Sequence, residues 1–213
     1  MTASGDRPAQ RFADRIESSV EIRAWTARRV IELRATGEAQ EAILRDLKAE
    51  RAELPRQGFL RLTDAQLVRR TELLAHMLTD VDRRACVWIM HADVAARFGP
   101  LRLDVRERDA WYDLVYQATI AEARGSPPPQ RPTEGQVAVF LQPTGNPARL
   151  DEWPTFRESD SPGALRRCSR EKALYLAASA WHGARRYAAD RVLATLDAFD
   201  SPQLENEVLG PSQ

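Results

Sequence analysis

"CVWIMHADVAARF" (residues 86–98) is the stretch of sequence that decides the fold class. On a helix, His91 shares a line with Val87, Val94 and Phe98, and Trp88 and its apolar neighbours fill a further face. A helix that is apolar around most of its surface is typical of a central, buried element. We therefore predict a buried helix over 81–98, ended by Gly99-Pro100.

The same stretch contains His91-Ala92-Asp93, a spacing that invites a metal or acid–base interpretation. Residues two apart on a helix point roughly 200° away from each other, so His91 and Asp93 cannot meet at one ion or one substrate atom. We interpret His91 as a buried core histidine satisfied by a hydrogen bond. A pH-sensitive or catalytic role for it is the alternative.

Helices are predicted on both sides of this stretch. Residues 9–36 carry an apolar stripe at spacings near three and four, and Gly37 is placed to end that helix; the stripe is Phe12, Ile16, Val20, Ala27 and Ile31. A second helix is expected over 38–54, where Pro55 and Gly58 would break it.

Capping patterns place the other helices. Thr63 with Gln66 precedes a helix over 64–79, and Asp104 with Glu107 precedes one over 104–124. The helix over 164–199 follows Ser161-Pro162.

Eight of the 13 prolines lie between Gly125 and Gly163, so residues 125–163 are expected to form a long, mostly irregular crossing segment. Within it, 136–142 can be a strand or a short helix capped by Thr133, and we prefer the helix because no second strand is evident. The fold class predicted is all-α: a single domain over 1–213, forming an irregular bundle of five to seven helices with a flexible tail over 201–213.

Composition limits the classes of function. Basic and acidic residues are equal at 31 each, which argues against general nucleic-acid binding. Almost all the basic residues are arginines, a bias of GC-rich genomes, and the layout is typical of small bacterial helical proteins. No apolar run approaches the length of a membrane span. The start of the chain lacks an apolar signal region, which indicates the cytoplasm unless a signal peptide has been removed.

Cys86 and Cys168 leave two alternatives open. They are two buried thiols in a cytoplasmic protein, or a candidate disulfide between distant helices in a periplasmic one.

The segment 143–163 carries Trp153 and Phe156 among charged residues that include Arg149 and Arg157. Aromatic residues ringed by charge are typical of protein contact surfaces, so these four residues are the predicted partner-binding site. The alternative is that the two aromatic residues pin the segment to its own bundle.

No catalytic, nucleotide-binding or metal-binding motif is present in the sequence, so no cofactor, metal or catalytic residue is assigned. The function predicted is a non-enzymatic protein–protein interaction module, such as an adaptor, regulator, secretion-associated or immunity-type protein. It would bind through helix faces and the 143–163 segment. The alternative is an α-helical enzyme or small-ligand binder with a pocket near His91, Trp88 and Trp111.

Overall fold

The computed structural model describes residues 7–79, 81–82, 85–86, 89, 104–127, 132–141 and 162–199. Every regular element in these ranges is helical, with no strand, which confirms the all-α class. In chain order they are α1 (Arg7–Ser18), α2 (Val20–Ala35), α3 (Gln40–Gly58), the short 3₁₀ helix η1 (Phe59–Arg61), α4 (Asp64–Thr79), α6 (Val105–Ala123), α7 (Glu134–Leu141), α8 (Pro162–Ser179) and α9 (Gly183–Phe199). Most of the proline-rich segment lies outside the described residues.

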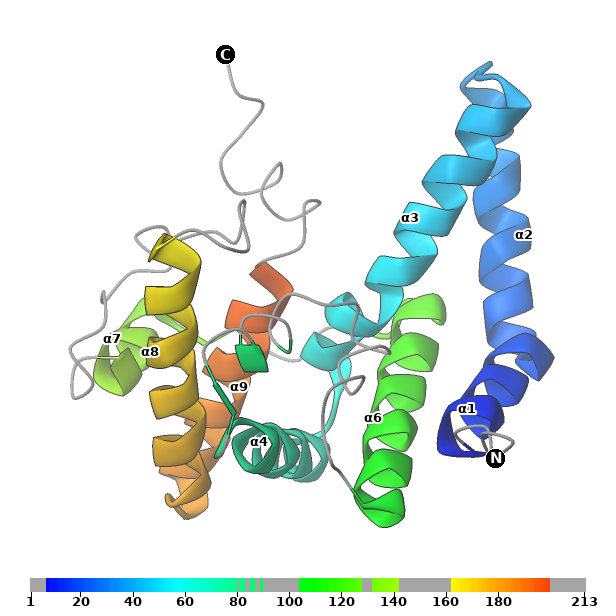
Figure 1. The fold of residues 1–213 in the computed structure, drawn as a ribbon. Coiled ribbons are helices and arrows are strands. Elements are labelled where there is room, and N and C mark those ends of the chain that lie inside the picture. Colours follow the sequence, from blue (N-terminus) through cyan, green and yellow to red (C-terminus); the bar gives the residue numbers. More distant parts are fainter. Residues whose placement is uncertain are drawn as a thin grey trace.

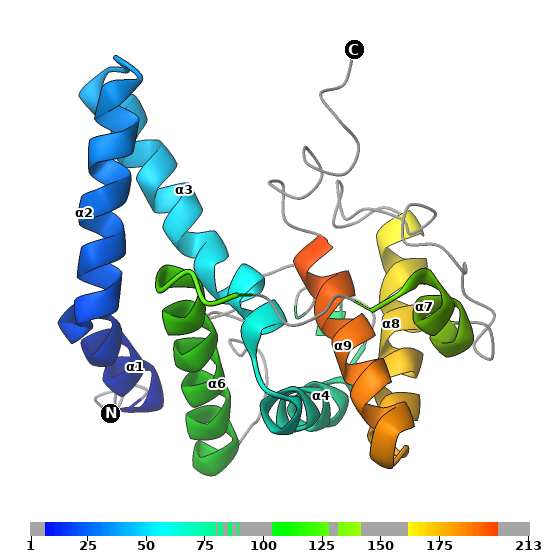
Figure 2. The same ribbon diagram turned by 180° about the vertical axis from the view of Figure 1, so that it is seen from behind.

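The helices pack around α4 and α6 (Figure 1). α4 packs against α8 and α9 on one side and against α6 on the other, while α1 and α3 both lie along α6. α2 and α3 form a helical hairpin, here called the arm, whose tip extends beyond α6 in both views (Figures 1 and 2).

The main core joins α4, α6, α8 and α9. Trp111 of α6 is fully buried, with its ring centre 5.9 Å from that of Phe59. Cys86 and Ile89 are buried in the same core, as expected for the helix predicted over 81–98. The predicted start is too early, because Val81 and Asp82 are not helical and the Asp82 side chain accepts a hydrogen bond from the N–H of Ala85 at 2.8 Å. Most of the remaining residues of that helix lie outside the described residues. A second, smaller cluster fixes the base of the arm and consists of Ile22, Leu54, Ile120 and Ala123, with Trp25 and Tyr116 packed on it.

The caps predicted at Thr63 and Asp104 are confirmed, whereas Ser161 lies outside the described residues. The backbone N–H of Thr63 donates to the Gln66 side chain at 2.9 Å, and Asp104 forms a full capping box with Glu107. The short helix preferred for 136–142 is α7, where Thr133 makes the same contacts with Gln136.

Two predicted helices are each divided in two. The helix expected over 9–36 breaks at Ser19, and the one expected over 164–199 breaks between Ser179 and Gly183. In the second break, the N–H groups of Ala180 and Trp181 close the last turn of α8. The apolar pattern continues across both breaks, so periodicity alone gave no signal of them.

α3 extends further than predicted, through Pro55 to Gly58. At Gly58 the two helices approach so closely that a Cβ would lie 1.9 Å from the backbone oxygen of Ala118. This glycine permits α3 to cross α6 closely rather than ending the helix.

Candidate interaction surface

Ser19 sets the orientation of α2. Its side chain accepts a hydrogen bond from the N–H of Ile22 at 3.2 Å, which caps the new helix. Because the chain breaks here, α2 starts in a different rotational phase from α1. The residues that α2 turns inward are therefore not those that continue the stripe of α1.

The inner face of α2 is buried against α3 and α6. Ile22 and Leu33 are only 3% and 6% exposed, and Trp25 packs on the cluster at the base of the arm. Arg29 holds the middle of the hairpin through two hydrogen bonds to Glu50 of α3, at 2.5 and 2.6 Å. This double contact fixes α2 against α3 with defined geometry.

The base of α2 is tied to the end of α6. Glu21 accepts a hydrogen bond from Arg124 and another from the Ser19 hydroxyl at 2.9 Å. The Arg124 hydrogen bond is the main reason that the pKa of Glu21 falls to about 2. Arg28 donates to the backbone oxygen of Ala123 at 3.3 Å. The arm is thus anchored at both its base and its middle.

The outer face of α2 is an exposed apolar stripe. Val20 is 64% exposed and Ile31 is 70% exposed, and the alanines between and beyond them are exposed as well. Their spacing places them in one line along the helix, about 22 Å long. We call this surface the α2 stripe; it consists of Val20, Ala24, Ala27, Ile31 and Ala35.

The other large exposed apolar residues of the described chain do not form such a line. Leu44, Val105, Val139, Leu176 and Tyr187 come from α3, α6, α7, α8 and α9, one from each helix. Single exposed apolar residues are ordinary on protein surfaces, whereas a contiguous apolar face calls for an explanation. The α2 stripe is therefore the candidate interaction surface.

A buried charge network holds the opposite end of the molecule together. Arg70 of α4 is 0% exposed and donates to Asp197 of α9, and also to the hydroxyl of Tyr175 of α8 at 3.2 Å. Arg56 of α3 donates to the backbone oxygen of Asp197 at 3.3 Å. Contacts from α3, α4, α8 and α9 thus converge on the buried ion pair of Arg70 and Asp197. Nε and Nη1 of Arg70 are buried without a hydrogen-bond partner among the described residues.

A second buried pair lies next to this network. Arg186 makes two hydrogen bonds to Asp190 one turn on, and it donates to the backbone oxygens of Ala178 and Val68 at 3.0 Å each. Burial raises the pKa of Asp190. These contacts join α9 to α8 and α4. Because Arg186 and Asp190 are buried and bonded to groups of the same chain, we assign them a structural role.

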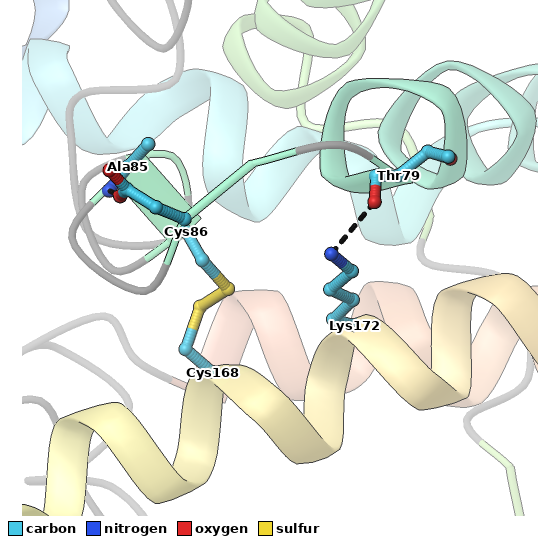
Figure 3. Close-up of a disulfide and its surroundings, with 6 residues drawn as sticks. Thr79, Ala85, Cys86, Cys168 and Lys172 are labelled. Atoms are coloured by element: carbon cyan, nitrogen blue, oxygen red, sulfur yellow. Dashed lines mark hydrogen bonds between the residues drawn. A yellow bond between two sulfur atoms is a disulfide. The ribbon is translucent and has the colours of Figure 1, made fainter.

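Cys86 and Cys168 are brought to disulfide distance, with Cα atoms 6.0 Å apart (Figure 3). Cys168 lies on α8, one turn before Lys172, whose amino group donates to the backbone oxygen of Thr79 at 2.8 Å. The cysteine pair links α8 to the chain that follows α4, and the Lys172 contact links α8 to the last residue of α4.

The residues predicted as sites have different outcomes. Trp153, Phe156, Arg149 and Arg157 lie outside the described residues, as do Trp88 and His91. Trp111, proposed as a pocket-lining residue, is a fully buried core residue. Among the described residues no group of three or more His, Cys, Asp or Glu side chains is placed to hold a metal ion.

The apolar series used to predict the first helix includes three residues of the α2 stripe and does not identify the face of α2 that is buried. Val20, Ala27 and Ile31 are exposed, and Ile22, Trp25 and Leu33 point inward instead. The second apolar series, at positions 22, 25 and 33, was the sequence signal that could have identified the buried face of α2. Periodicity alone does not decide which of two stripes a bundle buries.

No helix in the described ranges is both long and apolar enough to cross a membrane. Comparison of the chain with protein-family models, with curated proteins and with solved structures gave no match.

Proposed function

We propose that this protein is a non-enzymatic interaction module that binds another protein through the α2 stripe. The observation that carries the proposal is the exposed line from Val20 to Ala35 on a helix whose other side is anchored. Alanines in the line allow a partner helix to approach closely, and Val20 and Ile31 supply apolar contacts at its two ends. An adaptor, regulator, secretion-associated or immunity-type role suits such a surface.

The anchoring of the arm supports this proposal. A surface that is already ordered loses less conformational entropy on binding than a mobile one. The contacts of Arg29 with Glu50, and of Arg124 with Glu21, hold α2 in place without using the stripe itself.

The segment 143–163 remains a second proposed contact region, through Trp153 and Phe156 with Arg149 and Arg157. Replacing both aromatic residues with alanine should reduce partner binding and leave the helical circular dichroism unchanged. Loss of the fold in that variant would assign the two residues to the core instead.

The Cys86–Cys168 pair supports an oxidising compartment as the place of action, because structural disulfides persist there.

The proposal is tested by site-specific photo-crosslinking in the cells that produce the protein. A benzoylphenylalanine at position 27 should give discrete adducts with a protein identified by mass spectrometry. The same photo-reactive residue at Tyr187, an exposed position on α9, is the matched control and should give none of these adducts. Adducts from position 27 should disappear when Ile31→Glu is added. No adducts from position 27, or the same adducts from position 187, would contradict the proposal.

A further inference from the structure

We infer that the partner of the α2 stripe is a protein helix whose apolar face is bordered by acidic residues. This inference rests on the proposed function and names the chemistry of the partner. Its basis is the charge pattern that surrounds the stripe.

The carboxylates that border the stripe are neutralised within the protein. Glu21 is paired with Arg124, and Glu32 accepts a hydrogen bond from Arg29 at 2.7 Å. Glu38, the next carboxylate along the chain, follows Gly37, where a φ of 77° ends the helical backbone of α2. Acidic charge therefore contributes little to the stripe's surroundings.

The arginines that border the stripe form no ion pairs with described residues, so their positive charges are not neutralised within the protein. Arg23 and Arg28 donate only to the backbone oxygens of Glu17 and Ala123, and both are exposed. Arg34 is exposed and has no ion pair with any described residue. The three guanidinium groups lie on the two borders of the stripe and give it a net positive rim, which favours a partner with carboxylates at matching positions.

A second copy of this chain fits the stripe poorly. In an antiparallel pairing of two α2 helices, Arg23 and Arg34 of one copy would face Arg34 and Arg23 of the other. In a parallel pairing, the border with Arg23 and Arg34 of one copy would face the border with Arg28 of the other. Like charges opposed across an interface disfavour association, so a self-complementary dimer through this face is not the expected occupant.

An anionic membrane is also disfavoured. Helices that lie in a membrane interface bury large side chains such as Trp, Phe and Leu. The α2 stripe has three alanines among its five residues and none of those side chains. Its small residues suit a close helix–helix contact better than insertion among lipids.

The test uses the full-length protein and two synthetic helical peptides of about 20 residues, long enough to cover the stripe. Both peptides carry the same leucine face, bordered by glutamates in one and by lysines in the other. Fluorescence anisotropy should show that the glutamate peptide binds at least about tenfold more tightly, with the difference shrinking as salt is added.

Charge reversal at the rim should reverse this preference. In the R23E/R34E double variant the lysine peptide should become the tighter ligand. Arg106→Glu is the matched control, because Arg106 is exposed on the first turn of α6, and it should leave the preference unchanged. Ile31→Glu should weaken both peptides.

The outcomes separate this inference from the proposed function. Equal binding of the two peptides, or binding of neither, would overturn the inference, while adducts from position 27 would still uphold the interaction function. Sedimentation of the protein alone as a dimer that Ile31→Glu dissociates would assign the stripe to a second copy. Flotation with anionic vesicles that depends on Ile31 would assign it to a membrane. Either result would overturn the acidic-helix inference.

Discussion

Gly58 of α3 lies so close to Ala118 of α6 that a methyl group at Gly58 would sit 1.9 Å from the Ala118 backbone oxygen. Since backbone cannot move aside as a flexible side chain can, Gly58→Ala should push α3 away from α6. We expect a loss of about 1–3 kcal/mol in the free energy of unfolding, measured by urea denaturation. Gly135→Ala in α7, where a Cβ meets nothing closer than 3.9 Å, is the control. It should be neutral or stabilising, because alanine favours helix. Equal effects at the two glycines would contradict the close crossing.

Asp197→Asn should be strongly destabilising, because Arg70 would keep its buried charge without a carboxylate partner. The expected cost is about 3–5 kcal/mol in the free energy of unfolding. Asp109→Asn removes the partner of Arg11 in an exposed pair on α1 and α6 and should cost under about 1 kcal/mol. A similar small cost at both positions would show that the Arg70 charge is not confined to the core.

The two faces of α2 should respond differently to substitution. Leu33→Ala, on the buried face, should cost about 2–4 kcal/mol in the free energy of unfolding. Ile31→Glu, on the exposed face, should change it by less than about 0.5 kcal/mol. Chemical denaturation of both variants checks this orientation. A large loss from Ile31→Glu would mean that the α2 stripe is covered within the protein itself.

How much the sequence could predict is clearest at α2. The helical period, the caps at Thr63 and Asp104, and the end at Gly37 all follow from local rules, and each is present. Which side of α2 is buried depends on contacts with Leu54 and Ile120, far along the chain. Local pattern contains no information on those contacts, so the stripe from Val20 to Ile31 predicted a helix and did not reveal an exposed surface.

The buried charge network shows the same limit. Arg70 lies more than 100 residues before both Tyr175 and Asp197 in the sequence. Read along the chain, Arg70 lies in an ordinary charged helix. Only the packing of α4 on α8 and α9 brings the three side chains together, so no local pattern singles them out.

The Cys86–Cys168 pair should be oxidised in the isolated protein. Alkylation under denaturing conditions should label neither cysteine until a reductant is added, and the intact mass should be that of one chain. Reduction should lower the free energy of unfolding by about 2–4 kcal/mol, because the bond closes a long loop in the unfolded chain. A C86A/C168A variant should be insensitive to reductant. Labelling of both thiols without reductant would instead show two free cysteines.

The attachment of the arm should depend on acid pH through Glu21. Its pKa of about 2 lies below the ordinary value of 4.5, so the folded state favours the charged carboxylate. The contribution of this group to stability is therefore present at neutral pH and is lost as the pH falls from 4.5 towards 2. Carboxyl NMR titration should give the lowered pKa, and Arg124→Ala should move it back towards 4.5. Arg106→Ala should leave it unchanged; an ordinary pKa in the unaltered protein would contradict the Arg124 contact.

The bond between Cys86 and Cys168 turns the chain between them into a closed ring that includes all of α6 and α7. The arm and α4 precede the ring and are attached to it at Cys86. Most of α8 and all of α9 follow the ring and are attached to it at Cys168. A single cut of the backbone at any point within the ring opens it but leaves one covalent molecule. Two cuts there would be needed to release a fragment from the oxidised protein.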